Sequence, residues 1–223
     1  MAIRYNFNWP VIWRNSDKLI DGLALGLAIA VVALLIGCVL GIALAVCRNS
    51  RSPILRWPAT AFVEVLRNSP LLVLVFFIYF GLPELGFTAF DNIESFTATL
   101  AIYAGAYLTE VFRGGLQAIP NAYIEAGKAI GLSRWQRLRY VLLPLLFRIV
   151  LPSLSSALIS LFKDTALAAA IGVPELTYGA RWINVNTFQV LETWTIATVL
   201  YLAACYTIAI GLRQVERRYA MVR

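Results

Sequence analysis

Long apolar runs separated by short polar segments dominate the chain. The first run, residues 22–47, contains 26 residues and no charge, which corresponds to about 39 Å of helix and is enough to cross a bilayer. Four further apolar segments follow at about residues 59–82, 95–112, 145–162 and 190–212. This pattern predicts an all-α, multi-pass membrane protein with about five transmembrane helices.

The segment before the first apolar run lacks the apolar block of a secretory signal. Residues 1–21 carry Arg4, Arg14 and Lys18, and the run that follows is too long for a signal peptide. The sequence therefore predicts that the first span stays in the membrane. It shows no internal repeat and no polar linker, so we expect residues 1–223 to form a single transmembrane domain.

Composition and charge agree with a membrane location. The chain is 60% hydrophobic and 14% charged, with a mean hydropathy of +0.74, which excludes an ordinary water-soluble fold. Thirteen of the 19 basic residues lie at 48–56, 113–148 and 213–223, whereas the loop at 82–95 is acidic. By the positive-inside rule, this predicts an outer N-terminus and a cytoplasmic C-terminus. Membrane topology then explains the net charge of +7. No nucleic-acid partner is needed to account for this charge, and none is expected.

A basic loop at about residues 120–140 has internal structure. Pro120 favours a helix start, Gly131 can end that helix in a left-handed conformation, and Ser133 with Gln136 forms a capping box for a second helix running towards Pro144. Two interpretations of this helix-glycine-helix unit stay open. It could dock another protein on its small residues, or it could rest as an amphipathic helix on membrane lipid headgroups.

Specific motifs resemble those of a known family. Glu125-Ala126-Gly127, then Gly131, then residues 141–144 resemble the cytoplasmic motif of ABC importer permeases, with Gly127 and Val141 as mild departures. Residues 66–72, 76–81, 110–115 and 162–167 resemble the polar amino acid branch of that family.

The resemblance implies a bacterial inner-membrane permease that works by alternating access. Its implied partners are a second permease copy or related permease, a cytoplasmic ABC ATPase dimer, an extracytoplasmic solute-binding protein and a polar amino acid substrate such as glutamate, aspartate or glutamine. The residues expected to couple to the ATPase are Tyr123, Glu125, Ala126, Gly127, Ile130, Gly131 and Leu132.

The sequence offers little for catalysis, metal binding or a cofactor. Histidine is absent, and Cys38, Cys47 and Cys205 lie in apolar runs without ligand spacing. No GxxxxGK[ST] motif occurs. We therefore expect no enzyme activity, no metal and no cofactor in this chain, and ATP hydrolysis in a separate subunit.

Charged residues inside the apolar segments are candidates for a substrate path. Each costs about 2.5 to 3.5 kcal/mol at the centre of a span, so such groups normally face protein or a wet cavity. Structural pairing near the membrane boundary competes with this interpretation for Arg67 and Glu110. Lys163 and Asp164 could meet the carboxylate and ammonium of an amino acid. The complete set of path candidates is Glu64, Arg67, Glu110, Lys163, Asp164, Thr165 and Glu192.

Small residues recur every four positions in the first span, at Gly22, Gly26 and Ala30 and again at Gly37, Gly41 and Ala45. Close helix packing explains this spacing better than a pore.

Two other functions remain alternatives. An ion-gradient-driven secondary transporter could use Glu110 or Glu192 as a proton relay, but such folds usually contain repeated halves. A non-transporting membrane docking protein would explain the basic loop and would leave the charged span residues without a purpose.

Overall fold

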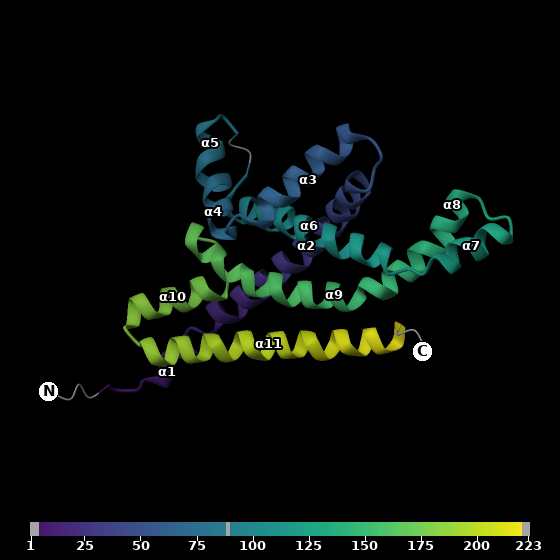
Figure 1. Cartoon of the computed structure of the whole chain (residues 1–223). Helices are drawn as coiled ribbons and strands as arrows, with labels where there is room; N and C mark the ends of the chain where they lie inside the picture. The colour runs from purple at the N-terminus through teal and green to yellow at the C-terminus, as the bar shows by residue number, and fades with distance from the viewer. Residues whose placement is uncertain (1–4, 88–89, 220–223) are drawn as a thin grey trace. The chain divides into compact units, whose positions relative to one another are not determined.

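The computed structural model describes residues 5–87 and 90–219, and every regular element in these ranges is helical (Figure 1). The all-α prediction is confirmed. The α-helices are α1 (Trp9–Arg14), α2 (Ser16–Arg48), α3 (Pro53–Arg67), α4 (Leu71–Phe76), α5 (Leu82–Glu84), α6 (Asn92–Gln117), α7 (Asn121–Ala129), α8 (Arg134–Arg137), α9 (Leu143–Asp164), α10 (Leu176–Thr187) and α11 (Val190–Tyr219). Two π-helical segments, η1 (Phe77–Gly81) and η2 (Leu138–Leu142), and the 3₁₀ segment η3 (Thr165–Ile171) join them.

Three continuous helices in the described ranges are long and apolar enough to cross a membrane, at Ser16–Arg48, Arg134–Ile171 and Val190–Arg218. A fourth span results if Pro53–Arg67 and Leu71–Glu84 cross together. The remaining predicted span lies within α6, which is 26 residues long. α6 contains threonines, tyrosines and Glu110 among its apolar residues. Its hydropathy is therefore lower than that of the three continuous spans.

The predicted second span, residues 59–82, is not one continuous helix. α3 ends at Arg67, where the backbone N–H of Asn68 donates to Glu64 O at 3.1 Å. Pro70 follows, and it lacks an N–H and disfavours a helical conformation at the preceding residue. Proline therefore breaks the helix at this point, and the hydropathy of the segment does not show the break.

Both π-helical segments lie just before a proline. η1 ends two residues before Pro83, and η2 ends two residues before Pro144. A proline ring clashes with the carbonyl four residues earlier, and a widened turn relieves that clash. The second helix of the basic loop consequently passes through Pro144 into α9. The predicted fourth span, 145–162, thus forms only the middle of a helix that begins at Arg134.

The chain forms two compact units, each built from discontinuous segments. Unit 1 comprises Met1–Ala33, Leu71–Leu100 and Ile159–Ile208, and unit 2 comprises Leu34–Pro70, Ala101–Leu158 and Ala209–Arg223. Each has its own apolar core. That of unit 1 contains Ile12, Leu19, Leu176, Ala180, Ile183 and Ala197. That of unit 2 contains Ala45, Leu108, Phe112, Ile119, Leu146 and Val150.

The small residues of α2 let other backbone segments approach within each unit. A Cβ atom added to Gly22 would lie 2.6 Å from the carbonyl carbon of Glu175 in unit 1. One added to Gly37 would lie 2.8 Å from the Cβ of Ala104 in unit 2. No side chain fits at such distances, so the packing interpretation of the stripe is confirmed at these positions.

Candidate functional site

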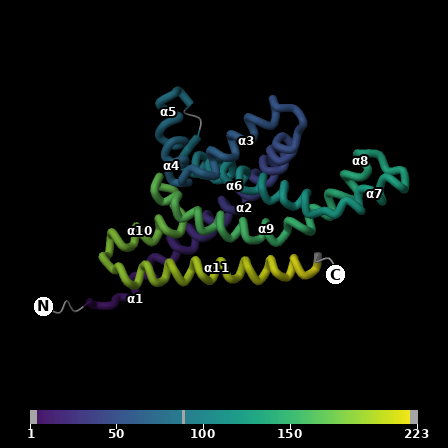
Figure 2. Tube along the Cα trace, in the orientation of Figure 1, coloured from purple at the N-terminus to yellow at the C-terminus, as the bar shows by residue number. Residues whose placement is uncertain are grey.

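The basic loop is the helix-glycine-helix unit that the sequence predicts (Figure 2). α7 begins directly after Pro120, and Gly131 has a φ of 77°, in the left-handed region. The N–H of Leu132 donates to Gly127 O at 3.0 Å and that of Gly131 donates to Lys128 O at 2.9 Å. These two bonds form a Schellman motif, which satisfies the last carbonyls of α7.

The capping box that opens α8 is also confirmed. The N–H of Gln136 donates to Ser133 Oγ at 3.3 Å, and the N–H of Ser133 donates to Gln136 Oε1 at 2.8 Å. Each side chain therefore satisfies a free donor of the other residue's backbone. Local signals between Gly127 and Gln136 fix both ends of this turn.

Arg137 closes the loop in a way that the sequence analysis missed. Its Nη1 donates to Leu132 O at 2.6 Å, and its side chain covers Gly127, where an added Cβ would lie 3.0 Å from Arg137 Cδ. Gly127 is the one buried residue of α7. The small surface that Gly127 was expected to offer to another protein is therefore covered in this structure by the chain's own Arg137.

The outward face of the loop remains available. Tyr123, Glu125, Ala126 and Ile130 are exposed, and Ile130 has 75% of its surface accessible. Trp135, 68% exposed, lies at the start of α8. Large apolar side chains beside a single carboxylate are suited to a protein contact. Leu132 is half-buried beneath this face.

Unit 2 brings two of the path candidates into an ion cluster. Arg48 donates to Glu110 at 2.5 Å and to Glu64 at 3.2 Å, and Arg113 donates to Glu110 at 2.5 Å. The cluster joins the end of α2 to α3 and α6. In the sequence Arg48 indicated only topology, although an arginine at the end of a span next to intramembrane acids is a signal for such pairing.

Arg67 also lies in unit 2, at the end of α3. Its guanidinium carbon is 5.5 Å from the centre of the Tyr107 ring, and Tyr107 Oη donates to Arg67 O at 3.2 Å. Its Nε is buried and has no hydrogen-bond partner among the described residues. These contacts place Arg67 against the face of α6.

The remaining path candidates lie in unit 1, at two places. Lys163 and Asp164 end α9, and neither forms an ion pair with any residue in the described ranges. Thr165 is fully buried and donates to Phe162 O at 2.7 Å. Lys163 is exposed and Asp164 half-buried, so both charges can meet a ligand.

Glu192 is engaged by the N-terminal segment. It is fully buried at the start of α11 and accepts hydrogen bonds from Tyr5 Oη and, at 2.6 Å, from the N–H of Asn8. Partial burial and the bond to Glu192 raise the pKa of the Tyr5 phenol, so the phenol stays a donor at neutral pH. Glu192 thus holds two chain segments together.

Glu175 is a buried carboxylate that the sequence analysis did not identify. It is the N-cap of α10 and accepts from the N–H groups of Thr177 and Tyr178, both at 2.8 Å, and from Tyr201 Oη at 2.7 Å. Glutamate is not a typical N-cap residue. The sequence around Pro174 and Glu175 therefore did not indicate that Glu175 caps α10.

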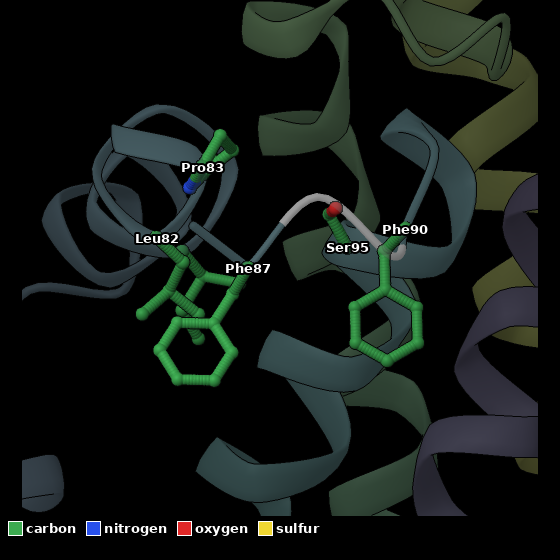
Figure 3. Close-up of a pocket in the computed structure, with 6 residues that line it drawn as sticks. Leu82, Pro83, Phe87, Phe90 and Ser95 are labelled. Carbon is green, nitrogen blue, oxygen red and sulfur yellow. The ribbon is translucent and has the colours of Figure 1, made fainter. Parts of the chain in front are cut away.

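An apolar pocket of about 230 Å³ lies in unit 1 (Figure 3). Ile78, Leu82, Pro83, Phe87, Phe90 and Ser95 line it. Among the described residues that line it, the single hydroxyl of Ser95 cannot neutralise a charged ligand, so this lining is poorly suited to an amino acid. Across residues 5–87 and 90–219 no group of three or more His, Cys, Asp or Glu side chains is arranged to hold a metal ion.

Comparison with protein families gives a match over residues 37–220 to the binding-protein-dependent transport system inner membrane component. The chain belongs to this family. The predicted resemblance to ABC importer permeases is thereby confirmed, and so is a multi-pass location in the inner membrane.

Known permeases of the family are similar over nearly their whole length. The glutamine transport system permease protein GlnP of Escherichia coli (strain K12) is 41% identical over 217 residues, which cover 95% of this chain and 97% of that protein. The probable amino-acid ABC transporter permease protein YckA of Bacillus subtilis (strain 168) is 32% identical, with 97% and 95% covered. A crystal structure of an amino acid ABC transporter with histidines matches with a TM-score of 0.88 and 28% identity, covering 96% of this chain and 100% of that one.

Membership places this permease in a multi-subunit importer. In such systems the transmembrane component works with a solute-binding protein and with an ATPase that is a separate subunit. The helix-glycine-helix loop and the membrane helices described above are thus parts of a transport machine rather than of a self-contained enzyme.

Proposed function

We propose that this chain is the permease subunit of an ATP-driven importer for glutamine. The observation that carries the proposal is the 41% identity, over almost both full lengths, to a glutamine transport permease. Probable glutamine permeases of Bacillus subtilis (strain 168), 31% and 34% identical, support the same substrate. A neutral amide side chain also avoids a net charge in the bilayer, which an imported glutamate or aspartate would carry.

The loop from Tyr123 to Leu132 is the proposed contact with the ATPase. Its exposed apolar residues and Glu125 would enter the ATPase surface, while the Schellman motif at Gly131 and the Arg137 contact keep α7 and α8 rigid. A rigid loop transmits a displacement of the ATPase dimer to α9, because α8 and η2 continue directly into that helix. This supports a mechanism in which ATP binding drives the change between inward-facing and outward-facing states.

The end of α9 is the proposed part of the substrate path in this chain. Lys163 and Asp164 carry opposite charges, are accessible and lack ion-pair partners in the described ranges. They match the carboxylate and ammonium of an amino acid. Thr165 supports the bend where α9 tightens into η3. In contrast, Glu64, Arg67, Glu110 and Glu192 contact other groups of this chain and serve the path indirectly.

We further propose that the two units act as one permease domain with its N-terminus outside and its C-terminus in the cytoplasm. Four long helices, α2, α6, α9 and α11, contain residues of both units. The basic residues of the α7–α8 loop and of α11's last turn support the cytoplasmic assignment of those segments. A second permease, identical or related, would complete the path.

Uptake by the reconstituted transporter tests the function. The permease is assembled with its ATPase and binding protein in vesicles, and accumulation of labelled amino acids is measured with ATP and with a non-hydrolysable analogue. We expect ATP-dependent accumulation of glutamine and little of glutamate or aspartate. Uptake that follows an imposed proton gradient without ATP would instead favour a secondary transporter.

Two loop variants test the docking surface. Gly131→Leu forces a bulky residue into the left-handed region, at a cost of about 1 kcal/mol or more, and Glu125→Lys reverses the only carboxylate of a basic segment. Both should reduce co-purification of the ATPase and uptake. If the loop binds lipid headgroups, the added positive charge should strengthen membrane attachment and spare transport.

A further inference from the structure

A second cavity in unit 1 is lined by charged and aromatic side chains. Its volume is about 400 Å³, which lies within the roughly 300 to 1,000 Å³ of small-molecule sites. It lies between the first turns of α2 and the helix α10. The lining residues are Lys18, Asp21, Leu25, Pro174, Tyr178, Gly179 and Trp182.

Two opposite charges face this cavity without neutralising each other. Lys18 and Asp21 lie three residues apart, on one face of α2, yet neither forms an ion pair or a side-chain hydrogen bond within residues 5–87 and 90–219. Lys18 Nζ lies 4.4 Å from the centre of the Trp182 ring. This cation–π contact fixes the position of the ammonium group while leaving its three N–H donors free.

The pair matches the charges of a free α-amino acid. Such a ligand carries an ammonium and a carboxylate on one carbon, so Asp21 can accept from the ammonium while Lys18 donates to the carboxylate. Tyr178 Oη, which makes no hydrogen bond within the described residues, can pair with a polar side chain. We propose that this cavity is an amino-acid binding subsite of the permease, and this proposal rests on the importer function proposed above.

One turn of α2 connects the cavity with the segment that follows α9. Along α2, Leu25 lines the cavity and Gly26 follows it, and a Cβ on Gly26 would lie 3.1 Å from Thr165 Oγ1. Thr165 directly follows Lys163 and Asp164. In the proposed orientation the start of α2 faces outward, so an amino acid released by the binding protein reaches the Lys18–Asp21 subsite first and the end of α9 second.

A local thiol-protection experiment tests the subsite. Leu25→Cys is introduced into a chain whose Cys38, Cys47 and Cys205 are replaced by serine, and the assembled transporter without binding protein is treated with a charged thiol reagent. We expect L-glutamine to slow labelling at position 25 in a concentration-dependent manner. Ala24→Cys, exposed on the same helix but outside the cavity, should be labelled at an unchanged rate.

Charge variants connect this protection to the proposed ion pairs. Asp21→Asn and Lys18→Met should each raise the half-protecting glutamine concentration about tenfold, equivalent to about 1.4 kcal/mol. Asp17→Asn and Arg181→Met are matched controls, because they remove equal charges nearby without touching the cavity, and they should change that concentration less than twofold.

A panel of ligands tests the same contacts in the Leu25→Cys chain alone. This test does not depend on whether the charge variants fold. N-acetylglutamine lacks the ammonium and glutamine amide lacks the carboxylate, so neither should protect Leu25→Cys. Phosphoethanolamine carries the charges of a zwitterionic lipid headgroup, and stronger protection by it than by any amino acid would overturn the proposal.

The outcomes separate this inference from the importer function. Native ATP-driven glutamine uptake together with equal protection in native, Asp21→Asn and Lys18→Met chains would overturn the subsite alone. Protection by an imported amino acid other than glutamine would overturn the assignment of glutamine and support the subsite.

Discussion

Unit 1 and unit 2 both hold carboxylates among apolar helices, and they stabilise them with different partners. Glu175 and Glu192 of unit 1 are fully buried and accept hydrogen bonds from backbone N–H groups and tyrosine hydroxyls. Glu64 and Glu110 of unit 2 keep 49% and 22% of their side-chain surface accessible and pair with arginines.

The difference follows from the degree of burial. A fully buried carboxylate needs several fixed donors, and short neutral groups supply them without adding a second large ion to the apolar interior. A partly exposed carboxylate can pair with a long arginine whose remaining donors reach water. A charge within an apolar run therefore does not by itself identify a substrate path, because both arrangements serve structure.

The largest effect should come from Glu175, because its removal leaves the most buried donors unpaired. In Glu175→Ala, the N–H groups of Thr177 and Tyr178 and the hydroxyl of Tyr201 lose their acceptor. We expect a loss of roughly 3 kcal/mol of folding free energy, measured as a lower thermal midpoint of the purified permease in detergent.

Glu175→Gln is the matched control, since its amide oxygen can still accept one or two of these bonds and should retain part of the stability. A native midpoint for the alanine variant would show that water or another acceptor replaces the carboxylate. The two units would then differ in the partners of their carboxylates and not in the folding free energy that these partners contribute.

A smaller effect is expected in unit 2, where the Arg48–Glu110 pair has 14% and 22% of its side-chain surface accessible. A double-mutant cycle with Arg48→Met and Glu110→Gln should give a coupling free energy of about 1 kcal/mol, measured by the same thermal unfolding. Arg113 still pairs with Glu110 when Arg48 is absent, and this limits the loss.

Salt provides a second measurement of the same pair. The coupling should fall as ionic strength increases, because water reaches both side chains. If the Arg48–Glu110 coupling free energy exceeded the folding free energy lost in Glu175→Ala, the expected order of the two units would be reversed.

The features predicted from the sequence are those with local signals. The loop turn was found because Pro120, Gly131 and the Ser133–Gln136 pair act within a few residues. The partners of the charges within the apolar helices were missed because they are distant in sequence: Arg48 and Glu110 are 62 residues apart, and Tyr5 and Glu192 are 187 apart. Only the fold brings such groups together.

Two local features of the predicted spans follow from stereochemistry, and hydropathy does not show them. Pro70 interrupts an apolar segment that was predicted as one span, and the helix through Pro144 extends beyond its apolar part because η2 accommodates the ring. Arg137 shows a third case. Its charge suggested lipid or topology, whereas its contact with Gly127 and Leu132 O depends on the loop geometry.

The smallest effect is expected for Tyr5→Phe, which removes one of the two donors that Glu192 has within residues 5–87 and 90–219. The hydroxyl donates to the carboxylate and accepts from the N–H of Leu191 at 3.2 Å, whereas Asn8 keeps its own bond to Glu192. Global unfolding should therefore be unchanged, and amide hydrogen exchange at Asn8 and Leu191 should accelerate, because the N-terminal segment opens more often from α11.

Tyr206→Phe serves as the control for this last variant, since Tyr206 is 67% exposed on the same helix and its hydroxyl makes no hydrogen bond within residues 5–87 and 90–219. It should leave exchange at both amides unchanged. Suppose instead that Tyr5→Phe lowers the thermal midpoint as much as Glu175→Ala does. The bond from Asn8 N–H would then be unable to stabilise the buried Glu192 carboxylate without the phenol. Neutral donors would then be individually indispensable in unit 1, instead of acting as a set in which Asn8 can compensate for Tyr5.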